Sequence, residues 1–387
     1  MSGLYLHIPF CKTKCLYCNF YAVASQRLAL GFTETLLLEI ENRSHQWIDL
    51  NLQTIYLGGG TPSLLPSEEI EKIMNAINRY FIVKPPCEIT LEANPDDITI
   101  ENLQSWLKAG VNRLSIGIQA LDDHILKFLG RRHNTAQALQ AYSMARNAGF
   151  KNISLDLIFG IPGLKNENWE NTLKKILSLY PEHLSCYALT LEEKTVYDDY
   201  IRKGKYPSPN DDLAAQQYEI LQDITSKNGY LQYEISNFCL PGYHSRHNSA
   251  YWHRIPYLGL GPSAHSFDGA QRWWNPPSLK EWKRLVSLNE ACPSEILTTI
   301  DKYNEYIMTS LRTSWGIKLS FITEKFGTSF AEYTLKIANS LMNHFLQQAD
   351  CDTIVIHPKA YILADGIIEK FFLTQDDKNI DFIKKSH

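Results

Sequence analysis

Three cysteines stand close together near the start of the sequence, at Cys11, Cys15 and Cys18. Three thiolates on one short loop can bind three irons of a cubane iron–sulfur cluster and leave the fourth iron open. An open iron can chelate the amino and carboxylate groups of a small molecule. The other five cysteines are scattered singly, so the sequence predicts metal ligation by these three rather than a disulfide framework.

A structural zinc site is the alternative for the same loop, with His7 as the fourth ligand. However, His7 falls within a predicted strand, and its ring would have to turn back toward the loop. The spacing therefore favours a [4Fe–4S] cluster on Cys11, Cys15 and Cys18.

A glycine-rich segment, 58–62 (Gly-Gly-Gly-Thr-Pro), follows the second predicted strand. A backbone without side chains can approach a ligand closely and offer its N–H and C=O groups. The alternative is a tight turn between a strand and a helix. No Lys-Ser/Thr pair completes the segment, which excludes a phosphate-binding P-loop.

Four polar residues, Glu92, Gln119, Arg131 and Asp156, lie at or just beyond the third, fourth and fifth predicted strands. A carboxylate in an apolar run such as 155–158 is costly unless it bonds a ligand or a partner. Each of the four could instead make a structural hydrogen bond or ion pair. Together with the cysteine loop, they indicate a pocket for a ligand.

Strands that alternate with helices must position these residues. The predicted strands are 4–7, 54–57, 88–92, 113–118, 153–158 and 183–189, and the predicted helices are 32–40, 67–80, 100–109, 134–149 and 166–179. Six successive βα units are sufficient for a full or partial parallel barrel. Because the loops that follow the strands of such a barrel converge on one face, we expect the polar and glycine-rich residues to meet at one site.

The chain divides into three predicted parts. A barrel core covers 1–195, an extension that closes one side of the barrel covers 196–292, and a small winged-helix-like domain covers 293–387. The extension contains a predicted helix at 211–228 and an aromatic-rich irregular region at 230–274. The last part contains predicted helices at 304–311, 319–326 and 330–347 and predicted strands at 353–356 and 360–363.

The charge balance gives no reason to expect nucleic acid as a partner. The chain carries a formal net charge of -4, so we expect the winged-helix-like part to have a structural or partner-docking role. The sequence shows no signal peptide and no apolar run long enough to span a membrane. We therefore expect a cytoplasmic protein.

The ordered set of motifs resembles the radical S-adenosylmethionine (SAM) proteins related to oxygen-independent coproporphyrinogen III oxidase. The resemblance rests on 5–18, 58–62, 92–95, 114–119 and 156–163 and covers nearly the whole chain. It implies an α/β fold with a partial (β/α)6 barrel and SAM on the open iron, where electron transfer to the sulfonium yields methionine and a 5′-deoxyadenosyl radical. It also implies a SAM pocket lined by Tyr5, Tyr17, Gly60, Thr61, Glu92, Gln119, Arg131, Asp156 and Ala188.

Residues 247–252 (His-Asn-Ser-Ala-Tyr-Trp) are similar to the HNxxYW motif of the heme chaperone branch of this family. An imidazole can ligate heme iron while neighbouring aromatic side chains pack against the macrocycle. From composition alone, a core histidine within an aromatic cluster is the alternative. The resemblance favours His247 as a heme ligand.

Two features differ from the oxidase itself. That enzyme carries an additional cysteine two positions after the third ligand, where this sequence has Phe20, and a long N-terminal segment that covers its porphyrin, whereas ten residues precede Cys11 here. The resemblance therefore predicts a heme chaperone that transfers heme to a heme-requiring acceptor protein, with the cluster and exchangeable SAM regulating heme binding or dimerisation. The rival is coproporphyrinogen III decarboxylation, and radical SAM methyl transfer is a third reading. The sequence names neither the acceptor nor the electron donor, and it leaves a homodimer and peripheral docking at a membrane open.

Overall fold

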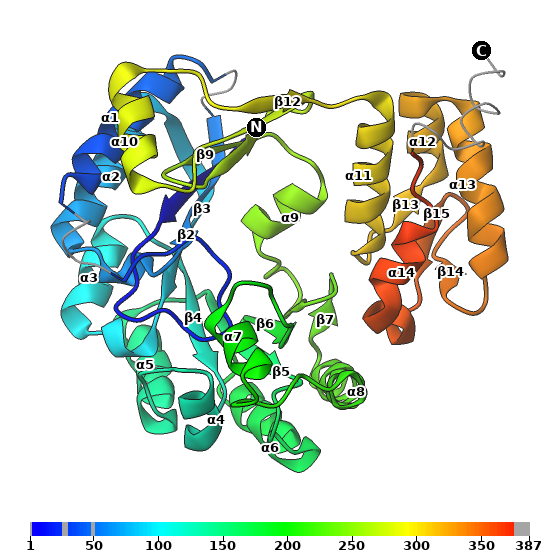
Figure 1. The fold of residues 1–387 in the computed structure, drawn as a ribbon, viewed down its shortest axis with the longest axis horizontal. Coiled ribbons are helices and arrows are strands. Elements are labelled where there is room, and N and C mark those ends of the chain that lie inside the picture. The colour runs from blue at the N-terminus through cyan, green and yellow to red at the C-terminus, as the bar shows by residue number, and fades with distance from the viewer. Residues whose placement is uncertain (1, 25–29, 48–50, 375–387) are drawn as a thin grey trace.

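The computed structural model describes residues 2–24, 30–47 and 51–374 of the chain (Figure 1). Six parallel strands lie side by side in chain order: β1 (Ser2–Ile8), β2 (Asn51–Gly59), β3 (Ile82–Ala93), β4 (Arg113–Gln119), β5 (Ile153–Phe159) and β6 (His183–Ala188). The helices that follow these strands are α1 (Phe32–Ser44), α2 (Ser67–Tyr80), α3 (Ile100–Lys108), α4 (Asp123–Phe128), α5 (Thr135–Ala148) and α6 (Asn166–Leu177). Figure 1 shows these helices along the outside of the curved sheet. The predicted (β/α)6 order is confirmed.

Alternation along each strand separates the helix-facing core from the interior of the barrel. In β4, Leu114 and Ile116 belong to the apolar core, whereas Arg113 and Ser115 line the central cavity. Successive side chains of a strand point to opposite faces, so one strand supplies both surfaces. The barrel interior is therefore polar where the sequence places polar residues at every second position.

Both edges of the parallel sheet are extended by later segments of the chain. β9 (Tyr257–Leu260) pairs in parallel with β1 and is followed outward by β10 (His265–Phe267), β11 (Gln271–Trp274) and β12 (Ser294–Ile296). At the other edge, β8 (Asn237–Cys239) pairs antiparallel with β6 and is followed by β7 (Leu231–Gln232). The sheet is therefore an open array of 12 strands among the described residues.

Four further helices belong to the middle of the chain. They are α7 (Val196–Arg202), α8 (Asp211–Lys227), α9 (Arg246–Trp252) and α10 (Leu279–Leu288). The predicted helix at 211–228 matches α8 to within one residue. The segment at 230–274, predicted to be irregular, instead contains the short strands β7 to β11 and the helix α9.

The C-terminal part forms a separate group of helices in Figure 1, in orange and red, around a three-stranded sheet. Its elements are α11 (Thr299–Leu311), β13 (Ile317–Lys318), α12 (Leu319–Phe326), α13 (Thr328–Leu341), β14 (Leu346–Gln348), β15 (Thr353–Ile356) and α14 (Ala364–Glu369). The backbone hydrogen bond from Ile235 N–H to the carbonyl of Arg312 (3.1 Å) ties this part to the barrel extension.

Two sequence predictions in this part are wrong. The predicted helix 330–347 ends at Leu341, because 346–348 form the strand β14 that pairs with β15. The predicted strand 360–363 is part of a 3-10 helix, Pro358–Leu363, in which Pro358 occupies the first turn. Proline at that position favours a helical start because its φ is fixed and its missing N–H is not needed there.

No helix of the described chain is long and apolar enough to cross a bilayer.

Candidate functional site

The cysteine loop follows β1 and is held by the backbone on both sides. Cys11 N–H donates to the carbonyl of Val23 (3.2 Å), and Val23 N–H donates to the carbonyl of Pro9 (2.7 Å). Lys12 adds an ion pair to Asp97, which lies in the turn after β3. These contacts close the loop, so that the three cysteines line one cavity of about 400 Å³ at the carboxyl end of the strands.

The donor set of this loop fits an iron–sulfur cubane better than a single zinc ion. No three His, Cys, Asp or Glu side chains in the described part of the chain are grouped closely enough to hold one metal ion. The His7 ring nitrogens are also engaged, with Tyr5 Oη at 3.1 Å and the carbonyl of Tyr21 at 2.8 Å. The zinc alternative therefore lacks its fourth ligand, whereas a cubane needs one thiolate for each of three separate irons.

Burial of the cysteine thiols opposes their ionisation, and nearby hydrogen-bond donors favour it. Burial raises the pKa of the Cys11 and Cys18 thiols. The Thr61 hydroxyl donates to Cys11 Sγ at 3.4 Å, and Arg131 Nη1 donates to Cys15 Sγ at 3.3 Å. Cluster binding requires thiolates, so these donors stabilise the form that iron would take.

The glycine-rich segment packs directly against the cysteine loop. A Cβ atom at Gly60 would lie 2.8 Å from the carbonyl oxygen of Phe10, which is closer than real Cβ contacts allow. Gly60 N–H also donates to the carbonyl of Ile8 at 2.9 Å. Glycine is therefore required here for close approach of two backbones, and this approach brings Thr61 to the cavity.

Two carboxylates lie inside the barrel beyond the cysteines. Glu92 accepts hydrogen bonds from the Tyr56 hydroxyl (2.8 Å) and Gly59 N–H (3.1 Å), and burial raises its pKa to about 7. Asp156 accepts from the Ser115 hydroxyl at 3.0 Å, and burial raises its pKa to about 6. Both groups lie within reach of a ligand that can donate hydrogen bonds, and such a ligand would favour their ionised forms.

Arg131 bridges the strand ends to the cysteine loop. Its Nη2 donates to Asn94 Oδ1 (2.6 Å) and to the carbonyl of Gly117 (2.7 Å), while its buried Nε has no protein partner. Gln119, the last residue of β4, has a left-handed backbone conformation with a φ of 69°. It lines the cavity. A guanidinium with one free donor beside the cavity can bind an anionic group of a ligand.

Eight of the nine residues predicted to line a SAM pocket line this cavity. They are Tyr17, Gly60, Thr61, Glu92, Gln119, Arg131, Asp156 and Ala188. Tyr5 lies behind the wall, where its hydroxyl contacts His7 and its ring packs near Tyr56. Sequence reasoning missed further lining residues, among them Tyr56, Arg113, Ser115, Ser185 and Tyr187. Arg113 and Ser115 lie on β4 and Ser185 and Tyr187 on β6, where the alternation of residues along the strand was their signal, and Tyr56 lies on β2.

His247, which the sequence predicts to ligate heme iron, lies on α9 within a buried aromatic cluster. His247 is only 1% exposed, its Nδ1 lies 2.8 Å from Thr54 Oγ1, and its Nε2 lies 2.9 Å from Tyr251 Oη. Burial lowers its pKa to about 3, so the ring is neutral. Iron would bind either nitrogen only after the hydrogen bond to Thr54 or to Tyr251 opens. The role of His247 as a heme ligand stays a prediction.

Two family models match the chain, one in its N-terminal half and one near its C-terminus. The model of the radical SAM superfamily matches residues 5–176, which contain the cysteine loop and the first five strands. The model of the HemN C-terminal domain matches residues 297–350. The first match ends before β6, and the second covers the C-terminal part from α11 to β14.

A solved structure shares the fold over most of the chain. It is coproporphyrinogen III oxidase (HemN) from Escherichia coli, with a TM-score of 0.83 and 23% sequence identity over 96% of this chain and 89% of that one. At this identity, the similarity establishes the fold alone.

Two relatives with higher identity that match over most of the chain are both described as heme chaperone HemW. Heme chaperone HemW from Lactococcus lactis subsp. lactis (strain IL1403) is 33% identical over 98% of both chains. Heme chaperone HemW from Bacillus subtilis (strain 168) is 37% identical over 85% of this chain and 88% of that one. The agreement runs from the cysteine loop to the C-terminal part, and the chain belongs to the HemW family of radical SAM proteins.

Proposed function

We propose that this chain is a cytoplasmic heme chaperone, which binds heme and transfers it to a heme-requiring acceptor protein. The observation that carries the proposal is the near full-length similarity to chains described as heme chaperone HemW. The cavity lined by Cys11, Cys15 and Cys18 supports a [4Fe–4S] cluster with exchangeable SAM as a second part of the same proposal.

Within that proposal, different residues of the cavity bind different groups of SAM. A bound cluster supplies an iron that can chelate SAM and pass an electron to its sulfonium. Arg131 has a free Nε for an anionic group, and Glu92 and Asp156 accept hydrogen bonds from donors of the ligand. Tyr56 and Tyr187 also line the cavity.

The barrel core, the extension and the C-terminal part are proposed to serve different steps. The core (1–195) would hold the cluster and SAM, the extension (196–292) would link them to the heme, and the C-terminal part (293–387) would dock the acceptor. The same proposal includes regulation of heme binding or dimerisation by the cluster and SAM.

Decarboxylation of coproporphyrinogen III is the rival activity. The fold of the Escherichia coli oxidase favours it, but that similarity shows the fold alone. Phe20 stands where the resemblance places the oxidase's additional cysteine, and its side chain is 62% exposed. An exposed phenyl ring cannot replace a thiol as a polar or metal-binding group.

One preparation separates the two activities. The cluster is reconstituted anaerobically in the full chain, and ferric heme binding is followed by absorbance while coproporphyrinogen III conversion is assayed with SAM and a reductant. We expect stoichiometric heme retention and no conversion. SAM-dependent formation of protoporphyrinogen IX without heme retention would overturn the proposal and establish the oxidase.

A further inference from the structure

The helix α9 carries the predicted heme ligand His247, and its first turn is fixed to the barrel. The backbone N–H groups of Arg246 and His247 donate to the two carboxylate oxygens of Glu88 on β3, each at 3.0 Å. The His247 ring stacks on the ring of Tyr56 on β2, with the two centroids 5.0 Å apart. The sheet therefore holds the start of α9, and the imidazole packs against the strands.

The two ring nitrogens of His247 have partners of different kinds. Nδ1 lies 2.8 Å from the hydroxyl of Thr54, which is 3% exposed on β2, between β1 and β3. Nε2 lies 2.9 Å from the hydroxyl of Tyr251, four residues further along the same helix. The contact at Nδ1 thus joins α9 to the sheet, whereas the contact at Nε2 is internal to α9.

Tyr251 has room to move away from the imidazole, and Thr54 does not. Tyr251 lines a cavity of about 280 Å³ that residues of α9 and α11 share, so its hydroxyl can turn toward water. Thr54 is closely packed, since a Cβ atom at Gly3 on β1 would lie 3.0 Å from its hydroxyl oxygen. Moving Thr54 would disturb the sheet. Nε2 is therefore the nitrogen that can be freed at the lower cost.

Only one tautomer of His247 is compatible with iron on Nε2. A neutral imidazole carries its proton on one nitrogen and binds a metal through the other. With iron on Nε2, the proton lies on Nδ1, which then donates to the hydroxyl oxygen of Thr54. A hydrogen bond at this position orients the ring and makes the ligating nitrogen more basic.

We propose that heme iron binds Nε2 of His247 after Tyr251 turns away, and that Thr54 is the positioning residue that holds the ring through Nδ1. This inference rests on the proposed heme chaperone function and specifies how its predicted ligand works. The Tyr251 hydroxyl occupies Nε2 in the heme-free chain and returns to it when heme leaves. Because a chaperone must release its heme, a competing donor on the same helix favours transfer.

Binding is a ligand exchange without electron transfer. The hydrogen bond from the Tyr251 hydroxyl to Nε2 breaks, and an Fe–N bond forms. The phenol keeps its proton and donates it to water, the Nδ1 proton stays on the ring, and the iron stays ferric throughout.

The first test removes the competing hydroxyl. Tyr251→Phe keeps the aromatic ring, so ferric heme is expected to bind about two- to tenfold more tightly than in the unaltered chain. Tyr303→Phe is the matched control and is expected to leave heme affinity unchanged, because the hydroxyl of the buried Tyr303 bonds Thr334 in the C-terminal part (2.9 Å). Absorbance titration of the full chain with its cluster in place measures the affinities. Equal or weaker heme binding in Tyr251→Phe would overturn the proposed competition.

The second test removes the hydrogen-bond acceptor at Nδ1. Thr54→Val keeps the size of the side chain and is expected to weaken heme binding by about tenfold or more, and to shift the electron paramagnetic resonance of the ferric heme. The oxidised [4Fe–4S] cluster is diamagnetic, so this signal reports heme alone. Thr54→Ser keeps the hydroxyl and is expected to restore both properties. Thr90→Val is the matched control, because Thr90 is buried on β3 and its hydroxyl has no hydrogen-bond partner among the described residues.

Unchanged affinity and resonance in Thr54→Val, or the same change in Thr90→Val, would overturn the positioning role of Thr54. If the unaltered chain binds heme and a folded His247→Ala variant binds it equally well, the inference fails while the proposed function stands. If the unaltered chain binds no heme, the proposed function fails and the inference fails with it.

Discussion

His247 supports the packing of the extension against the barrel. Its ring joins Thr54 on β2 to Tyr251 on α9, and its backbone N–H donates to the Glu88 carboxylate at 3.0 Å. His247→Ala is expected to lower the free energy of unfolding by about 2–4 kcal/mol, because it leaves a cavity and two hydroxyls without partners. Chemical denaturation measures the change.

The same variant tests the heme-ligand prediction that came from the sequence. If His247 ligates heme iron, His247→Ala is expected to lose stoichiometric heme binding under conditions where the variant is folded. Normal heme binding by the folded variant would show that this ligand assignment is wrong.

Glu92 gives the ligand-free protein a pH dependence that can be measured. Its pKa is raised to about 7 in the folded chain, so the folded state keeps a proton that the unfolded state loses at lower pH. The unfolded state therefore binds fewer protons between about pH 4.5 and 7, and stability falls as pH rises through that window. Glu92→Gln, which cannot ionise, is expected to flatten the profile.

Thermal unfolding at several pH values measures this profile. Glu68→Gln is the control, since Glu68 is exposed on α2. A profile that keeps its slope in Glu92→Gln would assign the titration to another group, with Asp156 as the first candidate because its pKa is raised to about 6.

Several site residues could be predicted because their residue types and their positions in the sequence already indicate a function. Cys11, Cys15 and Cys18 are close in sequence, and Asp156 is a charge within an apolar strand.

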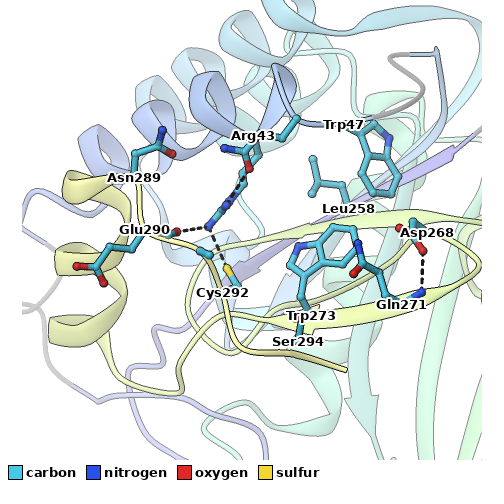
Figure 2. Close-up of a pocket in the computed structure, with 12 residues that line it drawn as sticks. Arg43, Trp47, Leu258, Asp268, Gln271, Trp273, Asn289, Glu290, Cys292 and Ser294 are labelled. Carbon is cyan, nitrogen blue, oxygen red and sulfur yellow. Dashed lines mark hydrogen bonds between the residues drawn. The ribbon is translucent and has the colours of Figure 1, made fainter. Parts of the chain in front are cut away.

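Residues whose role depends on a distant partner could not be found in this way. Thr54 is 193 positions from His247, and it is an ordinary residue until the fold places its hydroxyl 2.8 Å from Nδ1 of the histidine. Arg43 and Cys292 are 249 positions apart, and Figure 2 shows the guanidinium of Arg43 bonded to the sulfur of Cys292 at 2.9 Å.

At the scale of elements, the close approach between the glycine-rich segment and the cysteine loop determines the shape of the cavity. Gly60→Ala would place a methyl group against the backbone of Phe10. We expect the loop to shift and SAM affinity to fall by about tenfold or more, since backbone atoms cannot move aside as a flexible side chain can.

SAM binding to the reconstituted protein, followed by calorimetry, measures the effect of Gly60→Ala. The control is Gly366→Ala in α14, where an added Cβ meets nothing within 4 Å. This control is expected to leave SAM affinity unchanged and to raise helix stability slightly. Equal SAM affinity in both variants would mean that the backbone approach does not shape the site.

Element boundaries followed the sequence where local signals and tertiary contacts agree. α5 starts after Asn134, whose side chain forms a capping box with Gln137, and ends before Gly149 in a left-handed conformation. Local signals failed where long-range pairing decided the outcome. Residues 346–348 have helical periodicity in the chain, but they pair with β15 across the turn at Asp350, whose side chain accepts from Asp352 N–H and Thr353 N–H at 2.8 Å.

At the scale of the whole molecule, the cluster is expected to stabilise one end of the chain and not the other. A ligand that binds only the native state stabilises whatever must unfold to release it. The cysteine loop contacts β1, the glycine-rich segment and, through Lys12, the turn that contains Asp97. The contacts of the C-terminal part with the barrel extension include those of 234–235 with 312–313, Arg272 with Glu305 and Arg254 with Lys302, and none of these residues lines the cysteine cavity.

Removal of the cluster by a chelator is therefore expected to accelerate amide hydrogen exchange in 9–24, 58–65 and 94–99, and to leave 299–373 unchanged. Mass spectrometry of peptides from the two states measures both regions in one sample, so the C-terminal peptides serve as the internal control. Faster exchange in both regions would mean that the barrel and the C-terminal part unfold as one cooperative unit. In that case loss of the cluster would also disrupt the surface proposed to dock the acceptor, and cluster occupancy would control heme delivery through folding rather than through the SAM pocket.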